Sequence, residues 1–175
     1  HSLAVKSDDF YSTIGVHPCR ASEPFKDGGD LDDYFNKIRE ILKTDNHKYV
    51  AIGECGLDYD RFEYADKETQ LKVFPKHFEL TEEFNLPMYL HSRSTDGDFV
   101  KIIKENRQRF PGGVVHSFTG TKEELQEFIE MDLYIGVNGC SLKTQENLDV
   151  AKLIPLERLM IETDCPYCDI RNTHA

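Results

Sequence analysis

The fold of this 175-residue chain can be inferred from the stretch Tyr49-Val-Ala-Ile-Gly-Glu54. The stretch is largely apolar and partly β-branched, shows no clean alternation of polar and apolar residues, and ends on a carboxylate. Such runs are typical of strands in a parallel sheet that is covered on both faces. Five comparable runs occur along the chain, at Ser12–His17, Met88–His91, Gly113–His116, Leu133–Asn138 and Leu159–Asp164. We therefore predict six parallel strands.

Helical patterns fill the intervals between these runs. They cover residues 30–43, 67–85, 96–109, a segment that starts at Thr121, and Thr144 to Leu153. Pro75 should kink or split the second helix, because proline removes a backbone donor and clashes with the preceding turn. Thr121 followed by Glu124 is a capping-box start. Strands that alternate with helices predict right-handed βαβ units, here within a single domain over residues 1–175.

The spacing of the strand ends suggests the size of the complete architecture. From His17 to Asp164 the chain advances 147 residues over five units. At this spacing, eight units would need about 235 residues, close to the roughly 250 of a TIM (β/α)8 barrel. We therefore predict an α/β fold of the TIM-barrel type, here a partial barrel of about six βα units. A doubly wound open sheet is the alternative, although no glycine-rich phosphate loop follows the first predicted strand.

Composition and charge exclude several function classes. The formal net charge is −11, with 39% hydrophobic and 30% charged residues, which is typical of a globular protein. A protein this acidic should not bind nucleic acid broadly and without specificity, although bound cations can invert the local sign of charge. No apolar run approaches the roughly 20 residues of a membrane helix, and no signal-peptide pattern begins the sequence. We therefore expect no membrane association.

Four predicted strands end on residues that can bind metal ions, namely Glu54, His91, His116 and Asp164. In parallel α/β folds the carboxyl ends of the strands face the active site, so these side chains should converge. Imidazole and carboxylate ligands suit Zn²⁺, Mn²⁺ or Mg²⁺. A single histidine after an apolar run is usually a hydrogen-bonded core residue, but four ligand types at equivalent positions favour a metal site.

Other polar residues beside these ends have two interpretations each. Arg93 should point to the same side as His91, where it could bind a substrate anion or form a surface ion pair. His17 could contact substrate or be a structural histidine. Asp58 could orient a ligand or face solvent, and Glu162 could join the site or contact a neighbouring strand.

Four motifs together resemble the TatD family of metal-dependent deoxyribonucleases, in its eukaryotic branch. They are Gly53-Glu-Cys-Gly-Leu-Asp58, Leu90-His-Ser-Arg93, Val115-His-Ser-Phe-Thr-Gly120 and Ile161-Glu-Thr-Asp-Cys-Pro166. The resemblance implies a TIM-barrel hydrolase that cuts DNA phosphodiester bonds with divalent metal ions, in the nucleus, the cytoplasm or both. It also implies that the family's first two strands, with a His-x-His metal pair, precede His1, and that its C-terminal helices follow Ala175.

The resemblance also assigns roles to the site residues. Glu54 would be shared between two divalent ions, His91 and His116 would bind one of them, and Asp164 would bind the other and act as the water-activating base. In such a site one ion activates water while both stabilise charge on the phosphate.

Two other functions remain open from the sequence. One is a metal-dependent hydrolase of a C–N or ester bond, as in amidohydrolases, although no predicted strand ends on a lysine that could be carbamylated. The other is a shortened, non-catalytic chain that binds a partner, because six strands of a barrel leave two open edges. The metal-dependent deoxyribonuclease is the function that the motifs favour.

Overall fold

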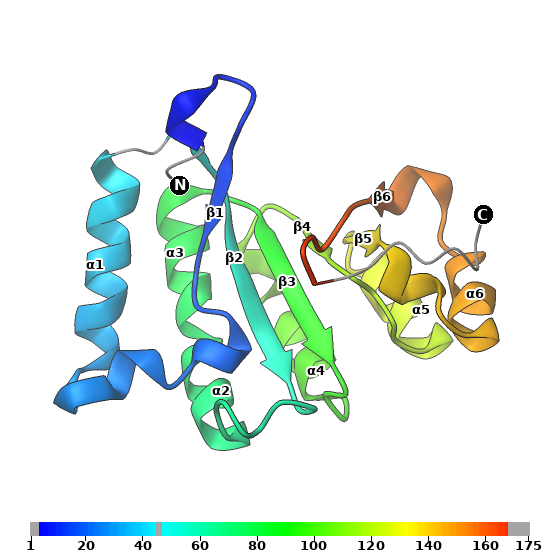
Figure 1. Ribbon diagram of the computed structural model, residues 1–175, viewed down its shortest axis with the longest axis horizontal. Helices are drawn as coiled ribbons and strands as arrows, with labels where there is room; N and C mark the ends of the chain where they lie inside the picture. The colour runs from blue at the N-terminus through cyan, green and yellow to red at the C-terminus, as the bar shows by residue number, and fades with distance from the viewer. Residues whose placement is uncertain (1–3, 45–46, 168–175) are drawn as a thin grey trace. The chain divides into compact units, whose positions relative to one another are not determined.

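A computed structural model describes residues 4–44 and 47–167 of the chain (Figure 1). The chain divides into two compact units, His1–Gly113 and Val114–Ala175. The single domain over residues 1–175 stays a prediction.

The first unit contains three parallel strands, β1 (Ser12–Ile14), β2 (Tyr49–Asp58) and β3 (Met88–Arg93). They pair in chain order, β1 with β2 and β2 with β3. Strands paired in chain order occur in a (β/α)8 barrel and also in one half of a doubly wound sheet, so the three strands of this unit fit both alternatives.

Four α-helices accompany these strands, namely α1 (Leu31–Thr44), α2 (Lys67–Val73), α3 (Lys76–Phe84) and α4 (Asp98–Asn106). The predicted break in the long helix is confirmed, since α2 and α3 are separate helices on either side of Phe74 and Pro75. Short 3₁₀ segments lie at Ala4–Lys6, Pro18–Arg20, Glu23–Gly28 and Arg107–Arg109.

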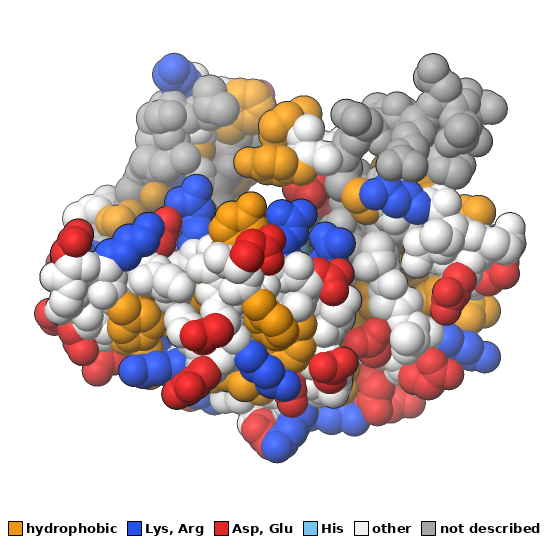
Figure 2. Space-filling model, turned by 60° about the horizontal axis from the view of Figure 1, so that its bottom comes forward, with side chains coloured by type: hydrophobic (Ala, Val, Ile, Leu, Met, Phe, Trp, Pro, Cys, Tyr) orange, Lys and Arg blue, Asp and Glu red, His pale blue; other side chains and the backbone are white. Residues whose placement is uncertain are grey.

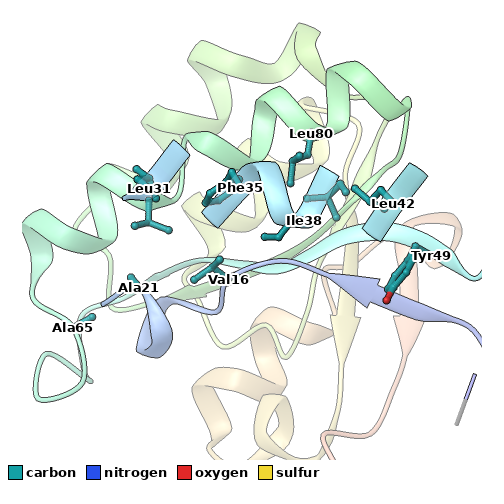
Figure 3. Packing of buried hydrophobic residues seen from close by; sticks show 11 residues of the cluster. Val16, Ala21, Leu31, Phe35, Ile38, Leu42, Tyr49, Ala65 and Leu80 are labelled. Carbon is teal, nitrogen blue, oxygen red and sulfur yellow. The ribbon is translucent and has the colours of Figure 1, made fainter. Parts of the chain in front are cut away.

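The core of this unit lies between α1 and the strands. Phe35 and Leu42 on α1 are fully buried, and Leu31 and Ile38 share their face of the helix. Figure 3 shows these side chains with Val16 and Tyr49 in the same cluster. The apolar positions of residues 30–43 therefore face the core, as their helical periodicity predicts.

The second unit repeats the pattern with shorter elements. They are β4 (Gly113–Val115, which starts at the unit boundary), α5 (Lys122–Glu130), β5 (Tyr134–Val137), α6 (Gln145–Ala151) and β6 (Leu159–Ile161), with 3₁₀ turns at Gly139–Leu142 and Leu156–Arg158. The strands pair in parallel and in chain order. The capping box of Thr121 and Glu124 is present, which confirms the predicted start of α5.

The strand–helix alternation of both units confirms the α/β class and is consistent with a partial barrel of six βα units. Among the described residues, no helix combines the length and the apolar character that crossing a membrane requires.

Candidate metal centre

The backbone of β2 bulges at Glu54. Gly53 pairs with Tyr89 and Cys55 pairs with Leu90, so Glu54 has no partner on β3. The expectation that Glu54 ends its strand is therefore wrong, because β2 continues to Asp58. A bulge leaves one residue out of the ladder and redirects its side chain, which is how a residue inside a strand can reach a site.

Two glycines make this backbone path possible. Gly53 and Gly56 have φ of +152° and +149°, a region that favours glycine. A Cβ atom added at either residue would overlap a backbone carbonyl of β3, that of Tyr89 or of His91. The glycines beside Glu54 thus permit both the local conformation and the close approach of β2 to β3.

The bulge brings the Glu54 carboxylate to two histidines. Its Oε1 lies 2.7 Å from Nδ1 of His91 and 3.3 Å from Nε2 of His17. The two imidazole rings are 4.8 Å apart between centroids. Each of the three residues offers one ligand atom within 4.8 Å of the others, and all three side chains are half-buried. A carboxylate with imidazoles is a donor set that fits Zn²⁺ or Mn²⁺.

The hydrogen bonds of His17 distinguish it from a metal ligand. His17 lies three residues beyond β1, at the start of a 3₁₀ turn, where its Nδ1 accepts the backbone N–H of Cys19 at 3.0 Å. A neutral imidazole whose Nδ1 accepts carries its proton on Nε2. Nε2–H of His17 is therefore a donor directed at Glu54. Its contact with substrate stays a prediction.

Asp58 lies on the inner side of this cluster and is only 2% exposed. Its Oδ2 is 3.0 Å from Nε2 of His91, and its Oδ1 accepts the N–H of Asp60. Burial alone would raise the pKa of Asp58, but the hydrogen bond and charge of His91 hold it below its ordinary value. Of the two interpretations of Asp58, the structure supports orientation of a ligand and not exposure to solvent.

Arg93 follows His91 by two residues at the end of β3. Its Nε donates to Oδ2 of Asp60 at 2.9 Å, and about half of each side chain is exposed. The surface ion pair that the sequence allowed is thus formed in the structure. Its contact with substrate stays a prediction.

The second unit holds the other predicted donors. His116 directly follows β4 and is buried, with Nδ1 3.7 Å from Oε1 of Glu162. The same Oε1 accepts the N–H of Ser117 at 2.5 Å. The side chain of Glu162 therefore reaches past β5 to the segment that follows β4, and lies next to His116. Carboxylates beside histidines often fix the orientation of a metal-binding ring.

Asn138 and Asp164 follow the other two strands of this unit. Asn138 donates from Nδ2 to Oγ of Ser117 at 3.0 Å and caps the 3₁₀ turn at Gly139–Leu142. Asp164 lies three residues beyond β6, with a half-buried side chain. Its role as a ligand and base stays a prediction.

Two buried polar residues of the α2–α3 segment were not anticipated. Gln70 is 1% exposed, and its side-chain amide binds both the N–H and the carbonyl of Asp58. Nε2 of His77 accepts the N–H of Val16 at 2.9 Å, next to His17. Burial lowers the pKa of His77 to about 4, so the ring is neutral near pH 7. Both lie at helical spacing among apolar residues, a pattern that could have indicated buried polar contacts.

Comparison with known proteins agrees with these features. The family described as "TatD related DNase" matches residues 1–174. "Deoxyribonuclease Tat-D" of Schizosaccharomyces pombe is 44% identical over 99% of this chain and 57% of its own length. "3'-5' ssDNA/RNA exonuclease TatD" of a Rahnella strain is 39% identical over 94% of this chain and 61% of its own length.

Solved structures show the same likeness. A TatD family hydrolase from Entamoeba histolytica superposes with a TM-score of 0.83 at 42% identity, covering 93% of this chain and 53% of that one. An uncharacterized amidohydrolase from Saccharomyces cerevisiae gives a TM-score of 0.82 at 34% identity, covering 99% of this chain and 62% of that one. The chain thus spans a little more than half the length of the relatives that it matches. With the bulged Glu54 beside His91 and a family match over almost every residue, this chain belongs to the TatD-related DNase family.

Proposed function

We propose that the protein is a divalent-metal-dependent deoxyribonuclease that hydrolyses DNA phosphodiester bonds. The observation that carries the proposal is the 2.7 Å approach of Glu54 Oε1 to His91 Nδ1, at a bulge that two glycines permit. The names of the relatives, which include deoxyribonucleases and an exonuclease, support the substrate class.

The residues present fit a divalent ion. Glu54 and His91 offer a carboxylate oxygen and an imidazole nitrogen, the ligand types that suit Zn²⁺ and Mn²⁺, and carboxylates also suit Mg²⁺. We propose two ions, with Glu54 shared between them, His91 and His116 as ligands of one, and Asp164 as a ligand of the other. Bound divalent ions lower the pKa of a coordinated water and neutralise charge on the phosphate.

The chain's own side chains have further roles in this proposal. His17 donates Nε2–H to an oxygen of the substrate phosphate, because its Nδ1 is occupied by the N–H of Cys19. The Arg93 guanidinium binds a neighbouring phosphate in competition with Asp60. Asp164 accepts the proton of the attacking water.

The overall charge of −11 is compatible with DNA as substrate. Figure 2 shows acidic and basic side chains interspersed over one face of the molecule. A cation at Glu54 and His91 would reverse the sign of charge where the phosphate binds. Binding should therefore depend on the metal, and DNA should bind weakly in its absence. We place this activity in the nucleus, the cytoplasm or both.

Cleavage assays with the full-length protein test the proposal. We expect hydrolysis of labelled single- or double-stranded DNA with Mg²⁺, Mn²⁺ or Zn²⁺, and none after chelation. Glu54→Gln should reduce the rate about 100-fold or more, because the ligand loses its charge. Glu105→Gln on α4, where the side chain is exposed, is the matched control and should retain full activity.

A panel of cyclic amides and simple esters, run in parallel, separates the alternative. Hydrolysis of these compounds without cleavage of DNA would replace the nuclease with an amidohydrolase-like function. Undiminished DNA cleavage by Glu54→Gln would overturn the proposed site, and no hydrolysis of any substrate by metal-loaded protein would overturn the function.

A further inference from the structure

The side chain of Gln70 holds Asp58 by its backbone. Gln70 Oε1 accepts the N–H of Asp58 at 2.8 Å, and its Nε2 donates to the carbonyl oxygen of Asp58 at 2.8 Å and to that of Ala65 at 2.9 Å. The amide thus uses its acceptor and both of its donors, which fixes its orientation. Since Gln70 is fully buried on α2, this contact ties the last residue of β2 to the helix that covers it.

Both oxygens of the Asp58 carboxylate also have hydrogen-bond partners. One oxygen, Oδ1, accepts the N–H of Asp60 at 3.1 Å, which leaves Oδ2 for Nε2 of His91 at 3.0 Å. The Asp58 side chain is almost inaccessible to solvent, with 3% exposed. A buried carboxylate requires a donor, and the nearest one is Nε2–H of His91.

The two nitrogens of His91 therefore face different surroundings. Nε2 faces the buried Asp58, whereas Nδ1 faces Glu54, whose side chain is 27% exposed. Both neighbours are carboxylates, so the ring alone does not determine which nitrogen binds a cation. Burial does, because a metal ion and its remaining ligands need the side that is open to Glu54 and His17.

We propose that Asp58, held in place by Gln70, is a positioning residue that keeps a proton on Nε2 of His91 and so presents Nδ1 to the metal. The proposal rests on the proposed function for the presence of a metal, and adds which atom binds it and why. It is a carboxylate–histidine–metal arrangement in which the helix α2 supports the carboxylate.

His17 provides an internal comparison in the same cluster. Its Nδ1 accepts the Cys19 N–H, so its proton also lies on Nε2, but that Nε2–H is the atom that faces Glu54. With a metal bound, the two histidines beside Glu54 would carry the same tautomer and present opposite atoms. His91 would present a lone pair to the metal, and His17 would present a proton.

Histidine NMR on the full-length, zinc-loaded protein tests this assignment without an activity measurement. In wild-type protein labelled with ¹⁵N on histidine, we expect His91 to be protonated at Nε2 and metal-bound at Nδ1. We expect His17 to be protonated at Nε2 without metal. A proton on Nδ1 of His91, with zinc on its Nε2, would overturn the proposal.

Two variants test the supporting residues. Asp58→Asn replaces the carboxylate that faces His91 with a neutral amide of nearly the same shape. Gln70→Met removes the amide that binds the Asp58 backbone, while it preserves the volume of the side chain. Each should weaken zinc binding about 10- to 100-fold, measured by calorimetry, and should broaden or shift the His91 Nε2–H signal. Unchanged zinc affinity and His91 signals in a folded Asp58→Asn protein would contradict the proposal, even if Gln70→Met did not fold.

Thr81→Val is the matched control. Thr81 is also a buried polar residue of the α2–α3 segment, and its hydroxyl bonds the carbonyls of Phe78 and Arg109, not the cluster. It should lower stability without changing the His91 signals. If wild-type protein binds no divalent metal, the proposed function fails; if it binds zinc through the other nitrogen of His91, only the present inference fails.

Discussion

Gly56 of β2 packs directly against the backbone carbonyl of His91 on β3, with no space for a side chain between them. Gly56→Ala should therefore push the two strands apart and also adopt an unfavourable φ. We expect a loss of about 3 kcal/mol or more in the free energy of unfolding, with a parallel loss of metal affinity. Gly112→Ala is the control, since an added Cβ there meets nothing within 4 Å. Equal stability of the two variants in chemical denaturation would contradict this account.

The core of the first unit should depend strongly on Phe35. Its side chain is fully buried on α1 against His77 and the apolar cluster, so Phe35→Ala would leave a cavity. We expect a loss of 3–5 kcal/mol, typical of buried phenylalanine. Ile41→Ala on the same helix, where 43% of the residue is exposed, should change stability by less than about 1 kcal/mol. Thermal and urea unfolding of both variants would check the difference.

Stability should fall on mild acidification because of His77. Its folded-state pKa of about 4 lies below the roughly 6.5 of an exposed histidine. Between these two pKa values the unfolded chain binds a proton that the folded chain does not. The contribution of the neutral His77 ring to the free energy of unfolding is therefore complete above about pH 6.5, and it is lost as the pH falls toward 4. From pH 7 to 4 this costs roughly 3 kcal/mol.

The variant His77→Gln isolates this effect from the other titrating groups. The difference in unfolding free energy between wild type and His77→Gln should shrink on acidification over this range. Thr81→Val, at a buried position of α3 without a titratable group, should keep the shape of the wild-type pH profile. A constant gap between wild type and His77→Gln would show that the buried ring does not titrate as described.

The capping box of α5 should be measurable in the second unit. Thr121 Oγ1 accepts the N–H of Glu124, and the Glu124 side chain accepts the N–H of Thr121. Thr121→Ala should cost about 1 kcal/mol, the usual value of an N-cap, whereas Thr121→Ser should cost little because it keeps the acceptor. Similar stabilities for both variants would show that the cap contributes nothing.

Arg93 should affect substrate binding more than turnover. If its guanidinium binds phosphate, Arg93→Ala should raise the KM for DNA about 10-fold with a smaller change in kcat. Asp60→Asn should lower the KM, because it releases the guanidinium from its ion pair. Arg109→Ala, which loses a comparable pair with Glu82, is the control and should leave both constants unchanged.

Local signals in the sequence predicted the fold well. Pro75 separates α2 from α3 and Thr121 caps α5, because proline and capping residues act on the adjacent backbone whatever the tertiary structure. The six apolar runs all contain strands, but their ends differ. β2 passes Glu54 and continues to Asp58, because the bulge depends on how β2 registers against β3.

The site could be predicted only in part for the same reason. The motifs identified Glu54 and His91, which the structure brings together. Gln70 was missed because its partner is the backbone of Asp58, twelve residues earlier, and backbone groups leave no pattern in a sequence. His77 was missed for the same reason, because its Nε2 accepts a hydrogen bond from the backbone N–H of Val16, which lies 61 residues away in the sequence.

The bulge at Glu54 has a consequence for how this protein can vary in length. Side chains of a strand alternate between its two faces, so deleting or inserting one residue between Glu54 and Asp58 would send one of the two carboxylates to the opposite face of the sheet. A substitution in this segment affects mainly its own position. A change in the length of the segment would instead separate the carboxylates of Glu54 and Asp58, which both contact His91. Natural or engineered variation here should therefore preserve the number of residues more strictly than their identity.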